Sequence, residues 1–171
     1  KRKGINDKFV YDLVSPYRYE YCSVSISRED ANNLVKKITP DIVYIDPPYN
    51  SRQYSRFYHI LENLTNWQKP NLYGEALKPI AENMSDYCRN SATERFNSLI
   101  NDINSDYIVV SYNNTYNSKS SSSRNKIEID RITEILKSKG SLKVYQKEHP
   151  HFNAGKSYFE NHREFIFIVT V

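Results

Sequence analysis

The stretch "DIVYIDPPYNSRQY", Asp41–Tyr54, decides how this chain folds. Its first part, Asp41–Ile45, has the aliphatic composition of a buried strand. Pro47 and Pro48 follow directly after Asp46. Each proline fixes φ and lacks a backbone N–H donor, so neither the interior of a helix nor a central strand can hold the pair. The chain must therefore leave its strand at Asp46 and enter a rigid turn.

Length and composition predict one ordinary domain, because 171 residues with 39% hydrophobic content can bury a core. No apolar run approaches the length of a bilayer, and the first ten residues lack the apolar region of a secretory signal, so we expect a cytoplasmic protein. Cys22 and Cys88 are too few for a disulfide framework or a zinc pair. A net charge of +4 permits a polyanionic partner, and 15 tyrosines either offer faces for unpaired bases or serve as amphipathic filler.

Hydrophobic periodicity predicts a strand–helix–strand unit at the start of the fold. Tyr21–Ser27 and Asp41–Ile45 have the pattern of strands, and Leu34, Val35 and Ile38 lie at helical spacing between them. Such a unit favours a parallel sheet with right-handed crossovers.

Two more helices are predicted in the middle of the chain, separated by a connection rich in proline. The first has an apolar face made of Phe57, Ile60, Leu61, Leu64 and Trp67. The second begins with Ser91 and Glu94 in the relation of a capping box. Its expected buried stripe is Phe96, Leu99, Ile100 and Ile103.

The last part of the chain returns to strands. Asp106–Ser111 is a short aliphatic strand, and the tract of serines and asparagines after it predicts a mobile surface loop. A helix closed by Gly140 and two final strands, "SLKVYQK" and "REFIFIVTV", follow. Two of the predicted strands end in polar clusters, "DPPYN" and "SYNN". Ligands of open α/β sheets bind outside the carboxyl ends of the strands, so we expect the chemistry there.

The turn Asp46–Tyr49 offers hydrogen-bond acceptors that suit a planar amine. The amino group of a nucleobase is a poor nucleophile, because its lone pair is delocalised until acceptors hold its hydrogens. The Asp46 carboxylate is one acceptor, and the Pro47 carbonyl is another, left free because Pro48 has no N–H. Tyr49 adds a face for stacking, worth about 1–3 kcal/mol. The simpler interpretation is a strand terminator, since Asp before Pro is common in turns.

These residues carry a resemblance to a known family. "DIVYIDPPYN" resembles the catalytic motif of amino-directed, S-adenosylmethionine-dependent DNA methyltransferases, and "DPPYNSRQYSRFYHILE" resembles the Dam-type (alpha-group) adenine methyltransferases in particular. "VVSYNN" is similar to the family's later strand and active-site loop, and "REFIFIVTV" to its closing strand. The resemblance covers about residues 21–171. It implies an α/β, Rossmann-like methyltransferase fold with a mostly parallel sheet and an antiparallel last strand.

The resemblance also implies a mechanism in a restriction–modification or phage system. A target adenine would be flipped out of double-stranded DNA, and Asp46 with the carbonyl of Pro47, fixed by Pro48, would hold its amino group. Tyr49 would stack on the ring while the nitrogen attacks the methyl group of S-adenosylmethionine. Asp30 would contact this cofactor together with Asp46. No metal is implied.

One part of the family's pattern is absent from this sequence. Such enzymes carry a segment of Phe-x-Gly-x-Gly character after their first strand, whereas the four glycines of this chain are widely separated. We therefore expect a partial fold, to which a second chain would supply the glycine-rich cofactor segment. Residues 1–20 would end a recognition region, and residues 21–171 would form the catalytic region with a helical insertion near 56–90.

Two groups of residues are candidates for contacts with DNA, and a solvated surface is the alternative for each. Near the turn these are Asn50, Arg52, Tyr54 and Arg56. In the serine-rich loop they are Lys119, Arg124 and Lys126. His59 and Glu62 either support the turn from behind or belong to a plain surface helix. His149 and His151 suggest a metal site, but no third ligand follows at a recognisable spacing, so we expect loop histidines near DNA or solvent.

Two other functions stay open from the sequence alone. The absent glycine-rich segment leaves room for a non-catalytic remnant that binds DNA, or a subunit that needs a partner chain. A related turn, Asn-Pro-Pro-Tyr, serves methyltransferases that act on RNA or on protein glutamine. Asp46 in place of Asn and the continuation "NSRQY" favour DNA adenine.

Overall fold

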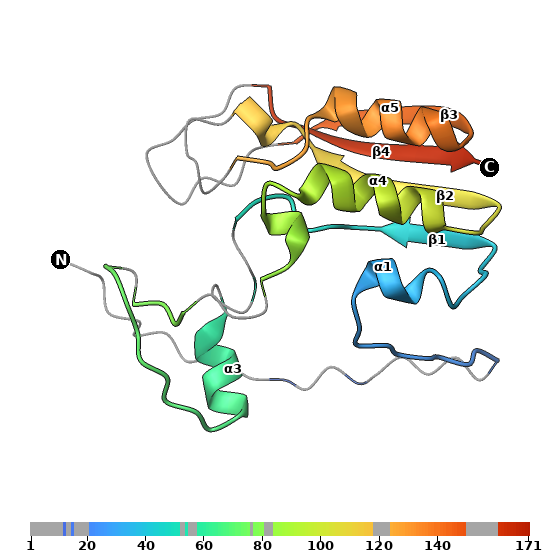
Figure 1. The fold of residues 1–171 in the computed structure, drawn as a ribbon. Helices are drawn as coiled ribbons and strands as arrows, with labels where there is room; N and C mark the ends of the chain where they lie inside the picture. The colour runs from blue at the N-terminus through green and yellow to red at the C-terminus, as the bar shows by residue number, and fades with distance from the viewer. Residues whose placement is uncertain are drawn as a thin grey trace.

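The computed structural model describes residues 12, 15, 21–51, 54, 58–75, 77–80, 84–117, 124–149 and 161–171 (Figure 1). The helices and strands of these residues are α1 (Ala31–Leu34), β1 (Ile42–Ile45), α3 (His59–Thr65), α4 (Ala92–Asp102), β2 (Tyr107–Asn113), α5 (Ile129–Lys139), β3 (Ser141–Glu148) and β4 (Arg163–Thr170). Short 3₁₀ turns occupy Asp86–Cys88 and Thr115–Asn117. No helix in these ranges has the length and apolar character that a membrane crossing needs.

The four strands form one mixed sheet in the order β1-β2-β4-β3. β1 pairs in parallel with β2, whereas β4 runs antiparallel to both β2 and β3. The antiparallel last strand is confirmed. β1, β2 and β3 run in the same direction and β4 runs against them, so the described strands agree with the predicted sheet, although β1 and β2 form the one parallel hydrogen-bonded pair among them.

The core lies between the sheet and helices α4 and α5. Both predicted helices form, and their apolar stripes are buried against inward-facing residues of β2 and β4. The stripe predicted for α4 is confirmed at Phe96, Leu99, Ile100 and Ile103. From α5 the core receives Ile132, Ile135 and Leu136, and from the strands Ile108, Val110, Phe167 and Val169.

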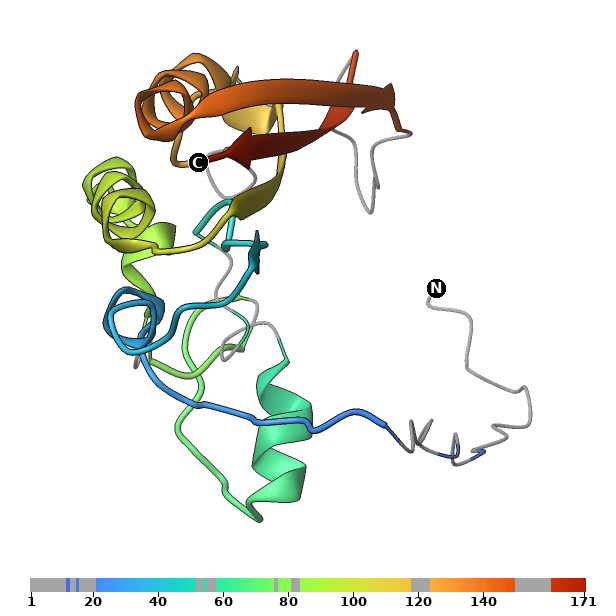
Figure 2. The same ribbon diagram turned by 90° about the vertical axis from the view of Figure 1, so that its right-hand side faces the viewer.

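The opposite face of the sheet has no helix on it among the described residues. In Figure 2 the described helices α1, α4 and α5 lie on one side of the strands, and Figure 1 shows α3 apart from the sheet. Strand pairing places Tyr44 of β1 beside Val109 of β2, and Val109 beside Ile168 of β4. These residues alternate with the core residues, so they share the uncovered face. Tyr44 is 62% exposed there.

The first predicted strand, Tyr21–Ser27, does not form. The segment is extended, but no described strand pairs with it, and Tyr21, Val24 and Ile26 are 96%, 83% and 90% exposed. A strand pattern predicts only a tendency, because the hydrogen bonds of a strand require a neighbour. The helix after it is also shorter than predicted and includes only Ala31–Leu34 of the expected span.

The capping box predicted for the second central helix is wrong, whereas the first central helix forms as predicted. Ser91 precedes α4, but its side chain donates a hydrogen bond to the Asp86 carbonyl instead of capping the helix with Glu94. The helix forms as α3, but the described residues of its apolar face are exposed. Trp67, just after its end, is 81% exposed. No described helix or strand covers α3, so its apolar face has no packing partner among these elements.

Gly140 ends α5 for a reason other than a left-handed cap. Its φ is 175°, an extended conformation that any residue adopts. A Cβ atom there would lie 2.2 Å from the carbonyl oxygen of Thr170 at the end of β4. The backbone of the connection between α5 and β3 therefore lies directly against β4, and a side chain at this position would separate them.

We predict that Gly140→Ala lowers the free energy of unfolding by about 3 kcal/mol, the cost of overpacking a closely packed site. Urea unfolding of the chain measures it. Gly74→Ala is the matched control, because Gly74 has a φ of +71° but open space around its Cβ position. It should cost only the strain of a left-handed residue, about 1 kcal/mol. Equal losses for the two variants would contradict the close approach at Gly140.

Candidate active site

The turn after β1 is held by a hydrogen bond within itself. Asp46 is exposed at the end of the strand, and the Tyr49 hydroxyl donates to its Oδ1 at 2.5 Å. Pro47 is buried, and no peptide bond in the described residues is cis. No hydrogen bond to the Pro47 carbonyl is formed within the described part of the chain. The turn thus presents a carboxylate and a backbone carbonyl on a rigid support.

The Tyr49 ring is half-buried and anchors the turn to the core. It meets the buried ring of Tyr112 edge to face, with ring centroids 5.0 Å apart. Burial, and then the hydrogen bond to Asp46, raise the pKa of Tyr49 well above its ordinary value. The phenol therefore stays protonated and acts as a donor to Asp46. The Ser111 hydroxyl lies 3.5 Å from the Tyr49 hydroxyl.

Parallel pairing brings the two predicted polar clusters to the same edge of the sheet. Ile45 lies beside Val110, so Asp46 and Ser111 are the next residues on adjacent strands. The register and the contact between Tyr49 and Ser111 therefore place the "DPPYN" and "SYNN" clusters side by side.

The tract after β2 is not the purely exposed loop that its composition predicts. Residues 118–123 lie outside the described part, but the two ends of the tract are packed together. The buried Asn125 side chain donates to the Asn113 carbonyl at 2.6 Å and accepts from the Thr115 hydroxyl at 2.5 Å. The next residue, Lys126, donates its backbone N–H to the Tyr49 carbonyl at 2.8 Å. A network of short polar side chains thus joins this tract to the turn.

The start of β4 adds residues that the sequence analysis missed. Glu164 lies opposite Asn113, and the backbone N–H of Arg163 donates to the Asn114 side chain at 2.9 Å. The buried His162 has its Nε2 3.4 Å from Glu164 Oε1. Burial, and also the negative charge of Asp46, raise the pKa of Glu164. Because β4 is antiparallel to β2, it begins beside the end of β2. The predicted antiparallel last strand could therefore have identified these residues.

The candidate residues outside the turn are distributed over several regions. Asp30 precedes α1, where its Oδ1 accepts the N–H of Asn32 at 3.0 Å. Asn32 in turn bonds to the carbonyl of Arg95 on α4, so Asp30 has a fixed position on the helix side of the molecule. His59 does not support the turn, because its Nε2 contacts the Leu77 carbonyl at 3.0 Å. Glu62 forms a hydrogen bond with Asn66 on the same helix.

The residues proposed to contact DNA are only partly described. Asn50 and Lys126 are half-buried, whereas Tyr54 and Arg124 are exposed. The Tyr54 ring lies 5.7 Å from that of Tyr58. The predictions for Arg52, Arg56, Lys119 and also His151 fall outside the described residues. Within the described ranges no group of three or more His, Cys, Asp or Glu side chains is placed to hold a metal ion.

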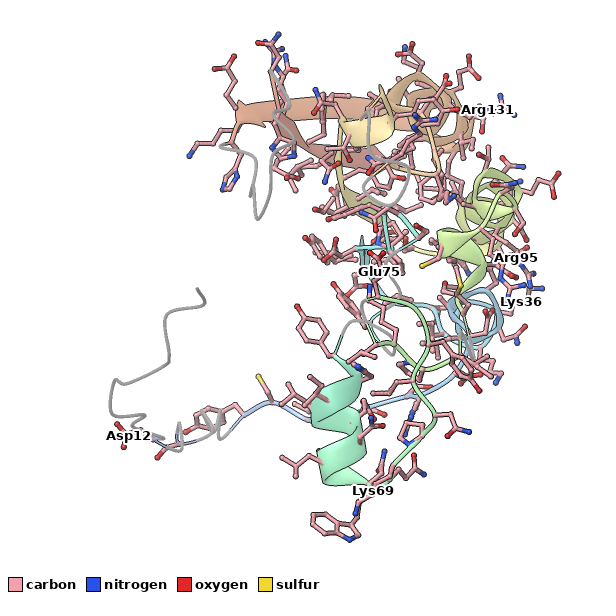
Figure 3. All side chains as sticks on the ribbon, turned by 90° about the vertical axis from the view of Figure 1, so that its left-hand side faces the viewer. Asp12, Lys36, Lys69, Glu75, Arg95 and Arg131 are labelled. Carbon is pink, nitrogen blue, oxygen red and sulfur yellow. The ribbon has the colours of Figure 1, made fainter. Side chains whose placement is uncertain are left out.

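Basic residues on the helix side are paired with acidic neighbours. Figure 3 shows Lys36, Arg95 and Arg131 along that side, away from the uncovered sheet face. Lys36 lies 3.4 Å from Asp102, and the corresponding distances are 2.7 Å for Arg95 to Asp86 and 2.6 Å for Arg131 to Glu134. These three basic side chains therefore each have an acidic partner on the helix side.

Comparisons with known proteins find similarity to DNA methyltransferases. Residues 19–96, which include the whole turn, match the model of the D12 class N6 adenine-specific DNA methyltransferase family. The chain is 41% identical over 120 residues to Type II methyltransferase M.FokI of Planomicrobium okeanokoites, which is 69% of this chain and 17% of that protein.

Two further relatives extend the comparison. The modification methylase StsI of Streptococcus sanguinis is 50% identical over 88 residues, which is 50% of this chain and 14% of that protein. Type II methyltransferase M.NlaIII of Neisseria lactamica is 33% identical over 140 residues, 81% of this chain and 39% of that protein. No solved structure gives a significant match. The chain is thus a relative of the D12 class N6 adenine-specific DNA methyltransferases, and it spans 14–39% of the length of these three proteins.

We predict that Asn125→Ala destabilises the chain by about 2 kcal/mol, because it leaves buried partners without hydrogen bonds. The amide of Lys126 should also exchange faster with solvent. Urea unfolding and hydrogen exchange measure the two effects. Asn101→Ala, at an exposed position of α4, is the control and should change stability by less than about 0.5 kcal/mol. A normal exchange rate at Lys126 in the Asn125 variant would contradict the link between the network and the turn.

Proposed function

We propose that this chain is the part of a DNA adenine methyltransferase that holds the target base, and that its turn Asp46–Tyr49 is the Asp-Pro-Pro-Tyr motif of a Dam-type enzyme. The observation that carries the proposal is the geometry of the turn. An exposed carboxylate and a backbone carbonyl that accepts no hydrogen bond from any described residue lie next to each other at the carboxyl edge of the sheet. The family match includes this turn. Restriction–modification is the proposed setting, since the relatives are named as Type II methyltransferases and modification methylases.

In the proposed reaction, a flipped-out adenine presents its amino group to the turn. The Asp46 carboxylate and the Pro47 carbonyl accept its two hydrogens, which increases the electron density on the nitrogen. Tyr49 holds Asp46 through its hydroxyl, and its ring offers a surface against which the base packs. Acceptors that are fixed before the substrate arrives need no reorganisation during the reaction. Pro47 and Pro48 contribute by making the turn rigid.

Methyltransferases of this class use S-adenosylmethionine, whose sulfonium group supplies an electrophilic methyl carbon. The chemistry of two described residues fits this cofactor. Asp30 and Asp46 have exposed carboxylates, which can accept hydrogen bonds from hydroxyl and amino groups and balance a positive charge. We propose that both carboxylates would hold it, Asp30 on the helix side and Asp46 at the carboxyl edge of the sheet. A glycine-rich segment that would let a backbone approach the cofactor is not part of this sequence.

Double-stranded DNA would approach the edge where the turn and the tract after β2 meet. The Lys126 backbone N–H donates to the Tyr49 carbonyl, so one described member of each group of candidate residues, Asn50 and Lys126, lies at the turn. We propose that Asn50, Arg52, Tyr54 and Arg56 contact the DNA from one side. Lys119, Arg124 and Lys126 would contact it from the other. Basic and amide side chains position phosphates without reading the sequence. We also propose a cytoplasmic location, since DNA is the proposed substrate.

We further propose that a Rossmann-like sheet is completed by a segment from elsewhere, either the same longer polypeptide or a second chain. The uncovered sheet face and the outer edge of β1 support this, because Ile42 and Tyr44 are exposed on a strand that has one described neighbour. An unpaired edge and an exposed apolar face are sites of association. Residues 1–20 would then belong to a recognition region and 21–171 to the catalytic region, with residues 56–90 as a helical insertion.

The function is tested by methyl transfer to adenine-containing duplex DNA from labelled S-adenosylmethionine, with cofactor binding measured by calorimetry. Asp46→Asn keeps the size of the side chain but removes its charge. We expect a loss of transfer of about 100-fold or more, the range for removing one preorganised group. Asp41→Asn, an exposed carboxylate before β1, is the control and should retain activity. Unchanged transfer in the Asp46 variant would refute the proposal.

The same assay separates the alternatives. A non-catalytic DNA-binding subunit would bind DNA but transfer no methyl group, even after the relatives' remaining region is added. An enzyme acting on RNA or on protein glutamine would be inactive on duplex DNA and active on one of those substrates.

The uncovered sheet face gives a separate prediction about stability. Tyr44→Lys should change the free energy of unfolding of the isolated chain by less than about 0.5 kcal/mol, as expected for an exposed position. It should also reduce binding of a hydrophobic dye. Val43→Lys, one residue earlier and packed against the core, should destabilise the chain by several times more. A large loss of stability in the Tyr44 variant would show that this face is covered.

A further inference from the structure

The carboxylate of Asp30, which the proposed function assigns to the cofactor, has one engaged oxygen and one open oxygen. Oδ1 accepts the backbone N–H of Asn32 at 3.0 Å, and the Asp30 carbonyl accepts the N–H groups of Asn33 and Leu34, each at 3.0 Å. Within the described part of the chain, no residue donates a hydrogen bond to Oδ2. Asp30 therefore caps α1 with one oxygen and leaves the other available to a ligand.

The chain around Asp30 has little regular structure to fix this carboxylate in place. Residues 21–27 before it are extended, exposed and unpaired with any described strand. The helix after it, α1, is a single turn, and a helix of that length is not stable without contacts from outside. Asn32 is the buried residue of α1, and Val35 follows the helix into the core. The position of Asp30 thus depends on the contacts of these two side chains.

The side-chain amide of Asn32 is held at both ends. Its Nδ2 donates to the carbonyl of Arg95 on α4 at 2.9 Å, and its Oδ1 accepts the hydroxyl of Tyr87 at 2.9 Å. A carbonyl only accepts, so the contact with Arg95 fixes which end of the amide faces α4. Asn32 and Tyr87 are both buried, so a group that loses its partner here finds no water to replace it.

The short 3₁₀ turn that carries Tyr87 is itself attached to α4. Arg95 Nε donates to Asp86 Oδ2 at 2.7 Å, across the contact between the turn and the helix. Figure 2 shows α1 beside α4 on the same side of the strands, and α4 is packed into the core. A continuous series of contacts therefore joins the core to Asp30, by way of α4, Tyr87 and Asn32.

We propose that Asn32 and Tyr87 are positioning residues for the cofactor, which hold the Asp30 carboxylate where its open oxygen can accept a hydrogen bond from S-adenosylmethionine. The inference rests on the proposed function, in which Asp30 binds this cofactor. A binding group that is in place for only part of the time lowers the apparent affinity in proportion to that fraction. Loss of either anchor therefore weakens cofactor binding without altering the carboxylate itself.

A purely structural role for Asn32 and Tyr87 makes a different prediction. Buried hydrogen bonds that only stabilise the fold would lower the stability of a variant but leave the cofactor affinity of its folded molecules unchanged. The positioning role predicts that protection of the Asn32 amide and affinity for S-adenosylmethionine fall together. Affinity for DNA should not change, because the residues proposed to contact DNA belong to the turn after β1 and the tract after β2.

The first test needs no cofactor. Tyr87→Phe keeps the aromatic ring but removes the hydroxyl that donates to Asn32. Hydrogen exchange of the Asn32 amide, which is bonded to Asp30 Oδ1, should become about 5-fold faster, the factor expected when one neutral hydrogen bond is lost. Tyr145→Phe, at an exposed position of β3, is the matched control and should leave this rate unchanged. Unchanged exchange in the Tyr87 variant would overturn the proposal, whatever the chain methylates.

The second test measures S-adenosylmethionine binding by calorimetry, for the full chain together with any region it needs to bind the cofactor. Tyr87→Phe should weaken binding by about 5-fold, and Asn32→Ala, which removes both side-chain bonds, by at least about 10-fold. Asn33→Ala, at the exposed neighbouring position, is the control and should bind normally. In methyl transfer, the KM for the cofactor should rise while kcat at saturating cofactor stays the same. Normal affinity in both anchor variants would contradict the positioning role.

Asp30→Ser separates this inference from the proposed function. Serine can cap a helix but has no carboxylate, so cofactor binding should fall while the Asn32 amide stays protected. Weak binding in Asp30→Ser together with normal binding in the anchor variants would overturn the positioning role and leave the proposed function intact. Normal binding in Asp30→Ser would remove Asp30 from the cofactor site and refute both assignments, whatever the exchange rate at Asn32.

Discussion

Everything at the active-site edge depends on the parallel pairing of β1 with β2. Because Ile45 lies beside Val110, the chain leaves both strands at the same edge, and Asp46 and Ser111 become neighbours. Parallel strands cannot be joined by a tight turn, so a long crossover must connect them. Here α4 completes that crossover and buries Phe96 and Ile100 against the sheet. The core packing of this one helix therefore fixes the relative position of two turns that carry the proposed chemistry.

The sequence predicts well those elements whose pattern lies within their own residues. The Asp46–Tyr49 turn follows from two prolines after an aliphatic run, and the buried stripe of α4 follows from helical spacing. Tyr21–Ser27 and α3 show where local signals are insufficient. Both have the apolar pattern of a packed element, but burial requires a partner, and none of the described elements provides one.

Site residues could be predicted where they lie at the end of a strand in the sequence. They could not be predicted where strand pairing in the folded chain brings them to the site. Asp46 was found because it follows a strand in the sequence, and Ser111 because it belongs to the polar end of one. Glu164 and His162 belong to the beginning of a strand and reach the same edge only because β4 is antiparallel to β2. Asn125 lies in a tract whose composition predicts exposure, yet its amide is buried because it satisfies the backbone at the end of β2.

The contact between the Tyr49 hydroxyl and Asp46 Oδ1 has a consequence for how such turns diversify. The hydroxyl donates to an oxygen, and an asparagine at this position would offer an oxygen in the same place. The two prolines and the packing of Tyr49 on Tyr112 do not depend on the charge. A lineage can therefore exchange the carboxylate for an amide without rebuilding the scaffold. Changes in the chemistry of the accepted amino group can then evolve separately from changes in the fold.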